Sequence, residues 1–236
     1  MFQIAIDGPV AAGKGTVSRL VAERLGFLYV DTGAMYRATA LLGDRAGVKW
    51  DDELELVKLI NAAKIEMRNP TNGEKDGRLT TILLDGEDVS WQIRTEKMGW
   101  GASSVAVLPA VREALVKKQQ QIAESQDVVM EGRDITYRVL PKADLKIFLT
   151  ASDAVRAKRR QLQLQTRGKD VEFEEVYAEL IKRDQQDMTR VTDPLKIIPK
   201  SWVLDTSELS IEEAVIMIVE KVQLMREESS NESVQR

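Results

Sequence analysis

The feature that most constrains this chain is a glycine-rich turn between an apolar segment, residues 2–7, and a predicted helix at residues 14–25. A glycine, four further residues, a second glycine and a lysine at residues 8–14 have the Walker A spacing. Glycines allow positive φ, so successive N–H groups point into one concavity, and the helix amino terminus adds partial positive charge. The sequence therefore predicts a loop that binds the phosphates of ATP, formed by Gly8, Pro9, Val10, Ala11, Ala12, Gly13, Lys14, Gly15 and Thr16.

The side chains of this loop predict how a triphosphate is held. Lys14 is expected to reach the β- and γ-phosphates. A hydroxyl in such loops binds Mg²⁺, but Gly15 occupies its usual position here and Thr16 follows one residue later. Thr16 is therefore the candidate metal ligand, displaced by one position.

The chain contains no cysteine and no histidine. Disulfides, thiolate metal sites, cysteine nucleophiles, Ser-His-Asp triads and histidine general bases are therefore excluded. Any metal must be held by oxygen atoms, which favours Mg²⁺ or a similar hard ion. Catalysis must depend on Lys, Arg, Asp, Glu, hydroxyl groups or backbone amides.

Composition and charge indicate a globular protein. Hydrophobic residues make up 43% of the 236 residues, which allows a sizeable core, and the net charge of −4 disfavours nucleic-acid binding. The first residues do not resemble a signal peptide, and no segment approaches the ~18 consecutive apolar residues of a membrane span. We expect a cytoplasmic monomer without nucleic-acid or membrane partners.

Apolar segments that suit buried strands alternate with helical patterns along the chain. Residues 65–89 differ, because turn residues divide them into three short segments with a hairpin at Asp85-Gly86. The pattern predicts an α/β fold with a doubly wound parallel sheet and a small β insertion, and ligands bind such sheets at the carboxyl ends of the strands. Strands are predicted at residues 2–7, 27–30, 128–130, 145–149 and 202–204, and helices at 14–25, 33–46, 52–63, 95–124 with a break near Pro109, 151–165, 172–188 and 211–225, before a polar tail at 226–236.

The segment Gly13-Lys14-Gly15-Thr16 is similar to the phosphate loop of nucleoside monophosphate kinases, and the Asn-Lys-x-Asp motif of GTPases does not occur. With Asp7-Gly8-Pro9 before it and Asp31-Thr32-Gly33-Ala34-Met35-Tyr36-Arg37 after it, the chain resembles the bacterial cytidylate (CMP/dCMP) kinases. Further matching segments lie in the same order along nearly the whole chain, at residues 85–90, 93–95, 109–115, 132–135, 146–149 and 183–190, together with Ser103.

The resemblance implies a P-loop kinase that transfers the γ-phosphoryl group of ATP, with Mg²⁺, to CMP or dCMP. The attacking phosphate oxygen is already anionic, so catalysis would rest on positioning and electrostatic stabilisation. The resemblance also implies a division of the chain: a P-loop kinase core at residues 1–36, 108–155 and 169–226, a nucleoside monophosphate-binding region at 37–107 with its β insertion at about 64–90, a helical lid at 156–168 and a flexible tail at 227–236.

The same resemblance implies roles for single residues. The catalytic residues would be Lys14, Arg133, Arg156 and Arg160, with the last two on the lid and facing ATP. The CMP ligands would divide by what they contact: Arg37 and Arg133 the phosphate, Ser103, Arg183 and Asp187 the ribose, and Thr32, Arg112, Asp134 and Arg190 the cytosine.

Spacing agrees with these roles but also allows a simpler explanation. Arg37 and Arg133 follow different predicted strands at the ligand edge of the sheet, where guanidinium groups can bind a phosphate bidentately. Arg183, Asp187 and Arg190 fall within about 60° on one helix face. Without the resemblance, surface salt bridges or a plain basic helix would account for these residues.

Four residues depart from the family pattern. Ala11 replaces a usual glycine, so we expect a positive-φ position to be lost or shifted. Thr136-Tyr137 replace the usual Gly-Thr and bring a bulky ring close to the expected acceptor pocket, and Thr32 replaces a common serine while keeping the hydroxyl.

Two other functions stay open. A UMP-preferring nucleotide kinase would share the phosphate loop, and Asp134 and Arg190 are the residues that distinguish it. A catalytically inactive P-loop protein could act as a nucleotide-binding regulator or bind RNA. The complete Gly13-Lys14-Gly15-Thr16 segment and the acidic net charge argue against that second function.

Overall fold

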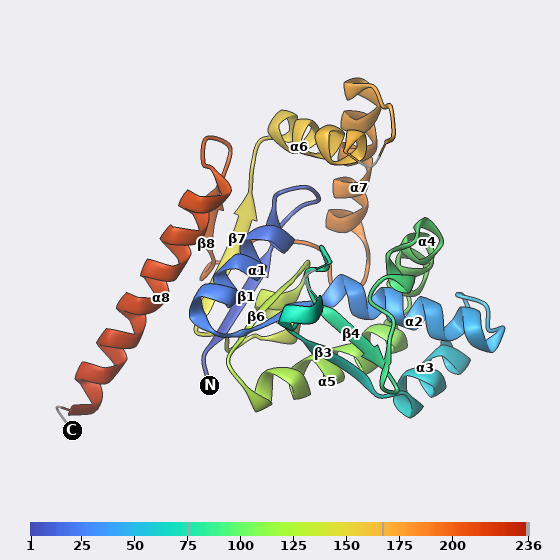
Figure 1. Cartoon of the computed structure of the whole chain (residues 1–236), viewed down its shortest axis with the longest axis horizontal. Coiled ribbons are helices and arrows are strands. Elements are labelled where there is room, and N and C mark those ends of the chain that lie inside the picture. The colour runs from blue at the N-terminus through green and yellow to red at the C-terminus, as the bar shows by residue number, and fades with distance from the viewer. Residues whose placement is uncertain (75, 167, 235–236) are drawn as a thin grey trace.

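Five parallel strands form the central sheet of the computed structural model, which describes residues 1–74, 76–166 and 168–234 (Figure 1). Their order is β2-β6-β1-β7-β8, so the first strand lies in the middle and its carboxyl end is flanked on both sides. This confirms the predicted α/β fold with a parallel sheet. The strands are β1 (Gln3–Asp7), β2 (Leu28–Asp31), β6 (Val128–Gly132), β7 (Leu145–Thr150) and β8 (Trp202–Asp205).

Helices cover both faces of the sheet. Alternate residues of β1 point to opposite faces: Ile4 and Ile6 belong to the hydrophobic cluster that includes residues of α1 and α8, and Ala5 belongs to the cluster on the other face. The helices are α1 (Lys14–Leu25), α2 (Thr32–Ala46), α3 (Glu53–Ala62), α4 (Glu96–Val105), α5 (Pro109–Ser125), α6 (Asp153–Gln165), α7 (Phe173–Thr189) and α8 (Ile211–Val234).

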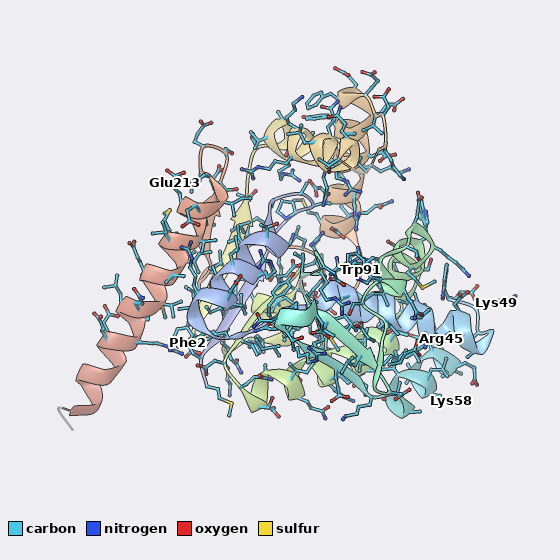
Figure 2. All side chains as sticks on the ribbon, in the orientation of Figure 1. Phe2, Arg45, Lys49, Lys58, Trp91 and Glu213 are labelled. Carbon is cyan, nitrogen blue, oxygen red and sulfur yellow. The ribbon has the colours of Figure 1, made fainter. Side chains whose placement is uncertain are left out.

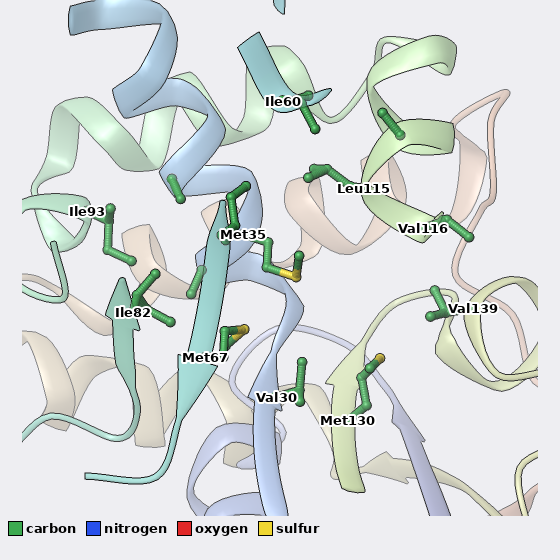
Figure 3. Packing of buried hydrophobic residues seen from close by; sticks show 14 of the residues in the cluster. Val30, Met35, Ile60, Met67, Ile82, Ile93, Leu115, Val116, Met130 and Val139 are labelled. Atoms are coloured by element: carbon green, nitrogen blue, oxygen red, sulfur yellow. The ribbon is translucent and has the colours of Figure 1, made fainter. Parts of the chain in front are cut away.

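The larger hydrophobic cluster joins the central sheet to a second, smaller sheet (Figure 3). Val30 and Met130 from the central sheet share this cluster with Met35 of α2, and with Met67 and Ile82 of the small sheet. All five side chains are at least nine-tenths buried. The small sheet is therefore packed onto the core, beside the strand ends at which ligands are expected.

The small sheet is antiparallel and consists of β3 (Ile65–Arg68), β4 (Thr81–Leu84) and β5 (Glu87–Asp88). The predicted hairpin at Asp85-Gly86 is confirmed, because β4 pairs with β5 across these two residues. Both have positive φ, 52° and 86°, which matches the twist of a tight hairpin. Short helical turns, η1 (Asn72–Glu74) and η2 (Gln92–Arg94), flank this sheet.

Side-chain caps explain several helix boundaries. The Asp52 carboxylate accepts a hydrogen bond from the Glu55 N–H and starts α3, and the Thr95 hydroxyl accepts one from the Met98 N–H and starts α4. Pro109 occupies the first turn of α5, so the predicted break near this proline is confirmed.

The end of α8 differs from the prediction. A polar tail was expected to fray from residue 226, but the helix continues to Val234. The Arg226 guanidinium lies over the rings of Phe2 and Phe27, at 5.2 and 4.8 Å, and pairs with Asp127 at 2.7 Å, which anchors the helix past its apolar part. Figure 2 shows Phe2 on the side of the molecule that faces α8. Residue 167 of the expected lid and residues 235–236 of the expected tail lie outside the described ranges.

Charged side chains lie at both ends of the molecule. Arg45, Lys49 and Lys58 are exposed at the end formed by α2 and α3, far from Glu213 on α8 (Figure 2). No helix in the described part of the chain combines the length and the apolar character that crossing a membrane requires.

Candidate active site

The glycine-rich loop between β1 and α1 has the backbone conformations that its sequence predicts. Gly8 passes so close to the Leu149 carbonyl oxygen that a Cβ atom would lie 2.0 Å from it, which excludes other residues. Gly13 has a φ of 92° and caps α1. Ala11 has a φ of 57°, so the positive-φ position expected to be lost is retained, at a cost of about 1–2 kcal/mol for a residue with a Cβ.

Lys14 is held inside this loop. Its Nζ atom donates hydrogen bonds to the carbonyl oxygens of Gly8 and Pro9, both at 2.8 Å, and the side chain is almost completely buried. Burial lowers the pKa of Lys14, and the nearby Arg133 guanidinium lowers it further, whereas Glu131 opposes this shift. The lysine is thus a desolvated cation whose charge an anionic ligand would stabilise.

Glu131 is a site residue that the sequence reading missed. It is the last residue but one of β6, opposite Asp31 at the end of β2, and its Oε1 accepts a hydrogen bond from the Tyr29 hydroxyl at 3.3 Å. Burial raises the pKa of Glu131, and the Asp31 carboxylate raises it further, although Lys14 opposes this. The sequence did contain a signal for this residue, because Glu131 is an acidic residue directly after the apolar segment 128–130, which is predicted to form a strand that ends at the ligand edge of the sheet.

The oxygen atoms around the loop suit a hard cation. Thr16 ends the loop with a hydroxyl, and the Glu131 carboxylate lies close enough to Lys14 to change its pKa. Hydroxyl and carboxylate oxygens suit Mg²⁺, which commonly uses one or two protein oxygens together with substrate phosphates and water.

Arginines gather beside Lys14. The Arg133 Nε donates to the Asp187 carboxylate on α7 at 2.7 Å. Loss of hydration in the cleft lowers the pKa of Arg183, and the neighbouring guanidinium groups of Arg133, Arg160 and Arg37 lower it further. The structure therefore brings Arg37, Arg133 and Arg183, three of the predicted CMP ligands, together with Arg160 of the predicted lid.

A second cluster surrounds Asp134, directly after β6. The Arg112 side chain is only 2% exposed and its Nη2 donates to Asp134, while its Nη1 donates to the Ala106 carbonyl at 3.1 Å. The Arg190 Nη2 lies 3.6 Å from the other oxygen of Asp134. Burial raises the pKa of Asp134, and both arginines oppose this. Three of the predicted cytosine ligands are thus in mutual contact.

Two other predicted CMP ligands have different surroundings. The Thr32 hydroxyl is buried and donates to the Glu131 carbonyl oxygen at 2.8 Å. Ser103 is exposed on α4, and its hydroxyl donates to the Gly99 carbonyl of the same helix at 3.3 Å. Their roles toward CMP stay predictions.

Arg156 lies where the sequence places it but is enclosed by protein groups. Its guanidinium donates to the Asp184 carboxylate at 2.5 Å and to the Val10 and Ala151 carbonyl oxygens at 3.0 Å. Asp184, another residue that was missed, also accepts from the Val10 N–H at 3.2 Å. Arg156 thus connects α6 and α7 to the loop, and its predicted orientation toward ATP stays a prediction.

A cavity of about 250 Å³ opens beside the loop. Arg160 lines this cavity, and so does Arg159, whose Nη2 donates to the Thr206 carbonyl at 2.6 Å. The cavity is also lined by Ala11, Ala12, Gly13 and Thr16 of the loop and by Leu209, Ile211 and Ala214 near the start of α8. A mostly apolar cavity that ends at a phosphate-binding loop has room for the base end of a nucleotide.

Asp7, at the end of β1, holds the segment after Asp134. Its carboxylate accepts hydrogen bonds from the Ile135 N–H at 2.9 Å, the Thr136 N–H at 2.8 Å and the Thr136 hydroxyl at 2.7 Å. These bonds fix the start of a short π-helix, η3 (Ile135–Val139). A fully buried aspartate in a core strand therefore positions the segment after Asp134.

Comparisons with known proteins agree with this geometry. A cytidylate kinase from Caldicellulosiruptor bescii is 45% identical over 219 residues, which are 93% of this chain and 94% of that protein. A cytidylate kinase from Pasteurella multocida is 42% identical over 220 residues, with the same coverage. A crystal structure of an uncharacterised protein from Eubacterium ventriosum shares the fold, with a TM-score of 0.53, 11% identity, and coverage of 94% of this chain and 99% of that one. The family model for cytidylate kinase matches residues 4–224, and the chain therefore belongs to the cytidylate kinase family.

Proposed function

We propose that this protein transfers the γ-phosphoryl group of ATP to CMP or dCMP, giving ADP and CDP or dCDP. The observation that carries the proposal is the buried Lys14 inside the glycine-rich loop, with the Arg133 guanidinium near it and a cavity lined by Arg160 beside the same loop. Like charges this close repel one another, and the phosphates of two nucleotides would relieve the repulsion. Membership of the cytidylate kinase family supports the same reaction.

The ATP site would combine the loop and the cavity. The loop N–H groups and Lys14 would bind the phosphates, and the base would enter the cavity beside Arg159 and Arg160. Thr16 and Glu131 would hold Mg²⁺. When bound, the ion would neutralise charge on the phosphates.

The transfer itself needs position more than acid–base chemistry. An anionic oxygen of the acceptor phosphate attacks the γ-phosphorus in line, and the bond from that phosphorus to the bridging oxygen of ADP breaks. Arg37 and Arg133 would hold the acceptor, while Lys14 and Arg160 would oppose the negative charge on the group in transfer. Their positions, fixed by α1, α2, the end of β6 and α6, would align the two phosphates before reaction.

Base selection would depend on the Asp134 cluster. Cytosine presents an N4 amine, for which a carboxylate is a suitable acceptor, and its O2 and N3 can accept from Arg112 or Arg190. Uracil would place a carbonyl oxygen against Asp134 and leave buried polar groups unpaired, which disfavours UMP strongly. The exchange Asp134→Asn should therefore reduce the preference for CMP over UMP.

The α6–α7 hairpin would act as the lid. In the segment between these helices, the Lys169 Nζ lies 3.5 Å from the Glu96 carboxylate of α4, so the hairpin meets the monophosphate-binding region across the site. Closing these parts over both nucleotides would exclude water and limit hydrolysis of ATP. The expected monomeric state and cytoplasmic location stay predictions, and gel filtration tests the oligomeric state.

The decisive experiment measures ADP release from ATP and Mg²⁺ with CMP, dCMP, UMP, AMP or GMP as acceptor. We expect turnover with CMP and dCMP, much less with UMP, and close to none with AMP and GMP. Lys14→Met is the matched inactive control, because it keeps the length of the side chain and removes the charge. Nucleotide binding without any ADP release above that control would favour the inactive regulator instead.

A further inference from the structure

Tyr137 makes a contact that its sequence neighbourhood does not predict. It lies on η3, three residues after Asp134, and its hydroxyl donates a hydrogen bond to the Pro194 carbonyl oxygen at 2.6 Å. The Lys196 ammonium lies 4.0 Å from the centre of the Tyr137 ring. Residues 190–198, between α7 and β8, have no helix or strand, so contacts of this kind determine where the segment lies.

The segment that Tyr137 holds carries Asp193. The Asp193 carboxylate accepts a hydrogen bond from the Arg112 Nε at 2.9 Å, and its main-chain carbonyl accepts from the Arg190 Nε at 2.8 Å. One residue therefore fixes both arginines that are proposed to read the base, Arg112 through its side chain and Arg190 through its backbone. Asp193 adopts a φ of 48°, a conformation in which Asn, Asp and Gly are tolerated best.

Asp193 supplies a second carboxylate to a cluster that is rich in arginine. Arg112 and Arg190 are two cations, and Asp134 supplies one carboxylate. Asp193 supplies the second, with its other oxygen 3.7 Å from the Arg138 Nε at the rim. Arg112 is buried, and its described carboxylate partners are Asp134 and Asp193. Without Asp193, the Arg112 guanidinium would bind the Asp134 carboxylate with more of its N–H donors.

We infer that Asp193 and Tyr137 are positioning residues that determine selectivity for the acceptor base. Asp193 occupies the Nε donor of Arg112 while Asp134 accepts from Nη2, so that the other oxygen of Asp134 stays available to the N4 amine of cytosine. Tyr137 keeps Asp193 in place through the adjacent Pro194 carbonyl. This inference rests on the proposed function, because it assigns the Asp134 cluster to the base of a pyrimidine nucleotide.

Three variants test the two residues separately. Asp193→Gly removes the carboxylate without strain, because glycine adopts a φ of 48° freely. Asp193→Asn keeps this backbone conformation and one acceptor for Arg112 but removes the charge. Tyr137→Phe removes only the hydroxyl that holds Pro194, and Tyr177→Phe on α7, which removes a hydroxyl from another part of the protein, is the matched control.

The measurement is kcat and KM of the full-length protein for CMP and UMP at saturating ATP and Mg²⁺, and KM for ATP. Asp193→Gly should lower the ratio of kcat/KM for CMP to that for UMP about tenfold, mainly by raising KM for CMP. Asp193→Asn should lie between wild type and Asp193→Gly, and Tyr137→Phe should lower the ratio about threefold. KM for ATP should stay within twofold in every variant, and Tyr177→Phe should match wild type.

Two results would overturn the inference. One is an unchanged CMP-to-UMP ratio in both Asp193→Gly and Tyr137→Phe, and the other is an equal loss for CMP, UMP and ATP, which would show a merely structural role. If Asp193→Gly fails to fold, Asp193→Asn and Tyr137→Phe decide by the same ratio. If the wild-type protein phosphorylates CMP and the variants keep its selectivity, only this inference is refuted. If the wild-type protein does not phosphorylate CMP, the proposed function is refuted as well.

Discussion

Replacing Asp7 by asparagine should destabilise the protein by about 1–3 kcal/mol. The Asp7 carboxylate accepts three hydrogen bonds, from the N–H groups of Ile135 and Thr136 and from the Thr136 hydroxyl. An amide has one oxygen in place of two, and although the Thr136 hydroxyl can turn to accept from the new NH₂ group, one buried N–H loses its acceptor. Such an orphaned donor costs about 1–3 kcal/mol.

The change of charge adds two opposing contributions to this estimate. Hydrogen bonds to an ionised acceptor are roughly twice as strong as neutral ones, so the bonds that survive in Asp7→Asn become weaker. Burial raises the pKa of Asp7, which means that the folded state disfavours its charge, and the neutral amide removes this cost. Because these contributions oppose each other, the orphaned N–H should dominate. The start of η3 should also shift, raising KM for CMP.

Urea unfolding at pH 7, followed by circular dichroism, measures the free energy of unfolding. Thr136→Val removes only the hydroxyl bond and should cost about 1 kcal/mol. Asp205→Asn is the control, because Asp205 also ends a strand of the same sheet and accepts from Ser207 but is exposed, so a change below about 0.5 kcal/mol is expected. A loss for Asp7→Asn no larger than that of Asp205→Asn would refute the reasoning.

Three further predictions concern the phosphate loop. Lys14→Met should lower kcat by at least about 10³-fold while leaving the circular dichroism spectrum unchanged, since it removes the cation nearest the transferred group; a loss below tenfold would contradict this role. Ala11→Gly should raise the free energy of unfolding by about 0.5 kcal/mol, because relief of the strain at φ 57° slightly exceeds the entropy of the unfolded glycine, and Ala11→Val should lower it. Binding of ATP without Mg²⁺ should be accompanied by uptake of protons by the protein at pH 7–8. Burial and Arg133 keep the pKa of Lys14 low in the free protein, and the phosphate anions of ATP raise this pKa again. Calorimetry in buffers of different ionisation enthalpy measures the uptake, which Lys14→Met should reduce.

The fold was predictable because its signals are local. The glycine loop, the apolar strand segments, Pro109 and the Asp85-Gly86 hairpin each act through neighbouring residues, and the structure confirms the elements that they predict. The end of α8 was not predictable in this way. Its extension depends on Arg226 packing against rings near the amino terminus, a contact between distant parts of the chain.

Some residues of the candidate site could be predicted because their residue type and their position at the end of a strand were enough to identify them. Lys14, Arg133 and Asp134 follow strands at the ligand edge, and the structure gathers them there. Asp193 could not be found from the sequence, because its partner Arg112 is far away along the chain and an isolated aspartate has many possible roles. Arg156 shows the converse, because nothing local indicates that the Asp184 carboxylate and the Val10 carbonyl oxygen of the loop enclose it.

The two halves of the site differ in how their charges are compensated, and this difference matches the two kinds of group that a nucleotide presents. On the phosphate side, burial lowers the pKa values of Lys14 and Arg183, and the neighbouring Arg133 guanidinium lowers both further, which favours a polyanion. On the base side, Asp134 and Asp193 pair with Arg112 and Arg190, which suits an uncharged ring that is read by hydrogen bonds. A chain with a net charge of −4 can therefore attract nucleotides, because several of its cations lie together in the cleft, where the local field steers binding.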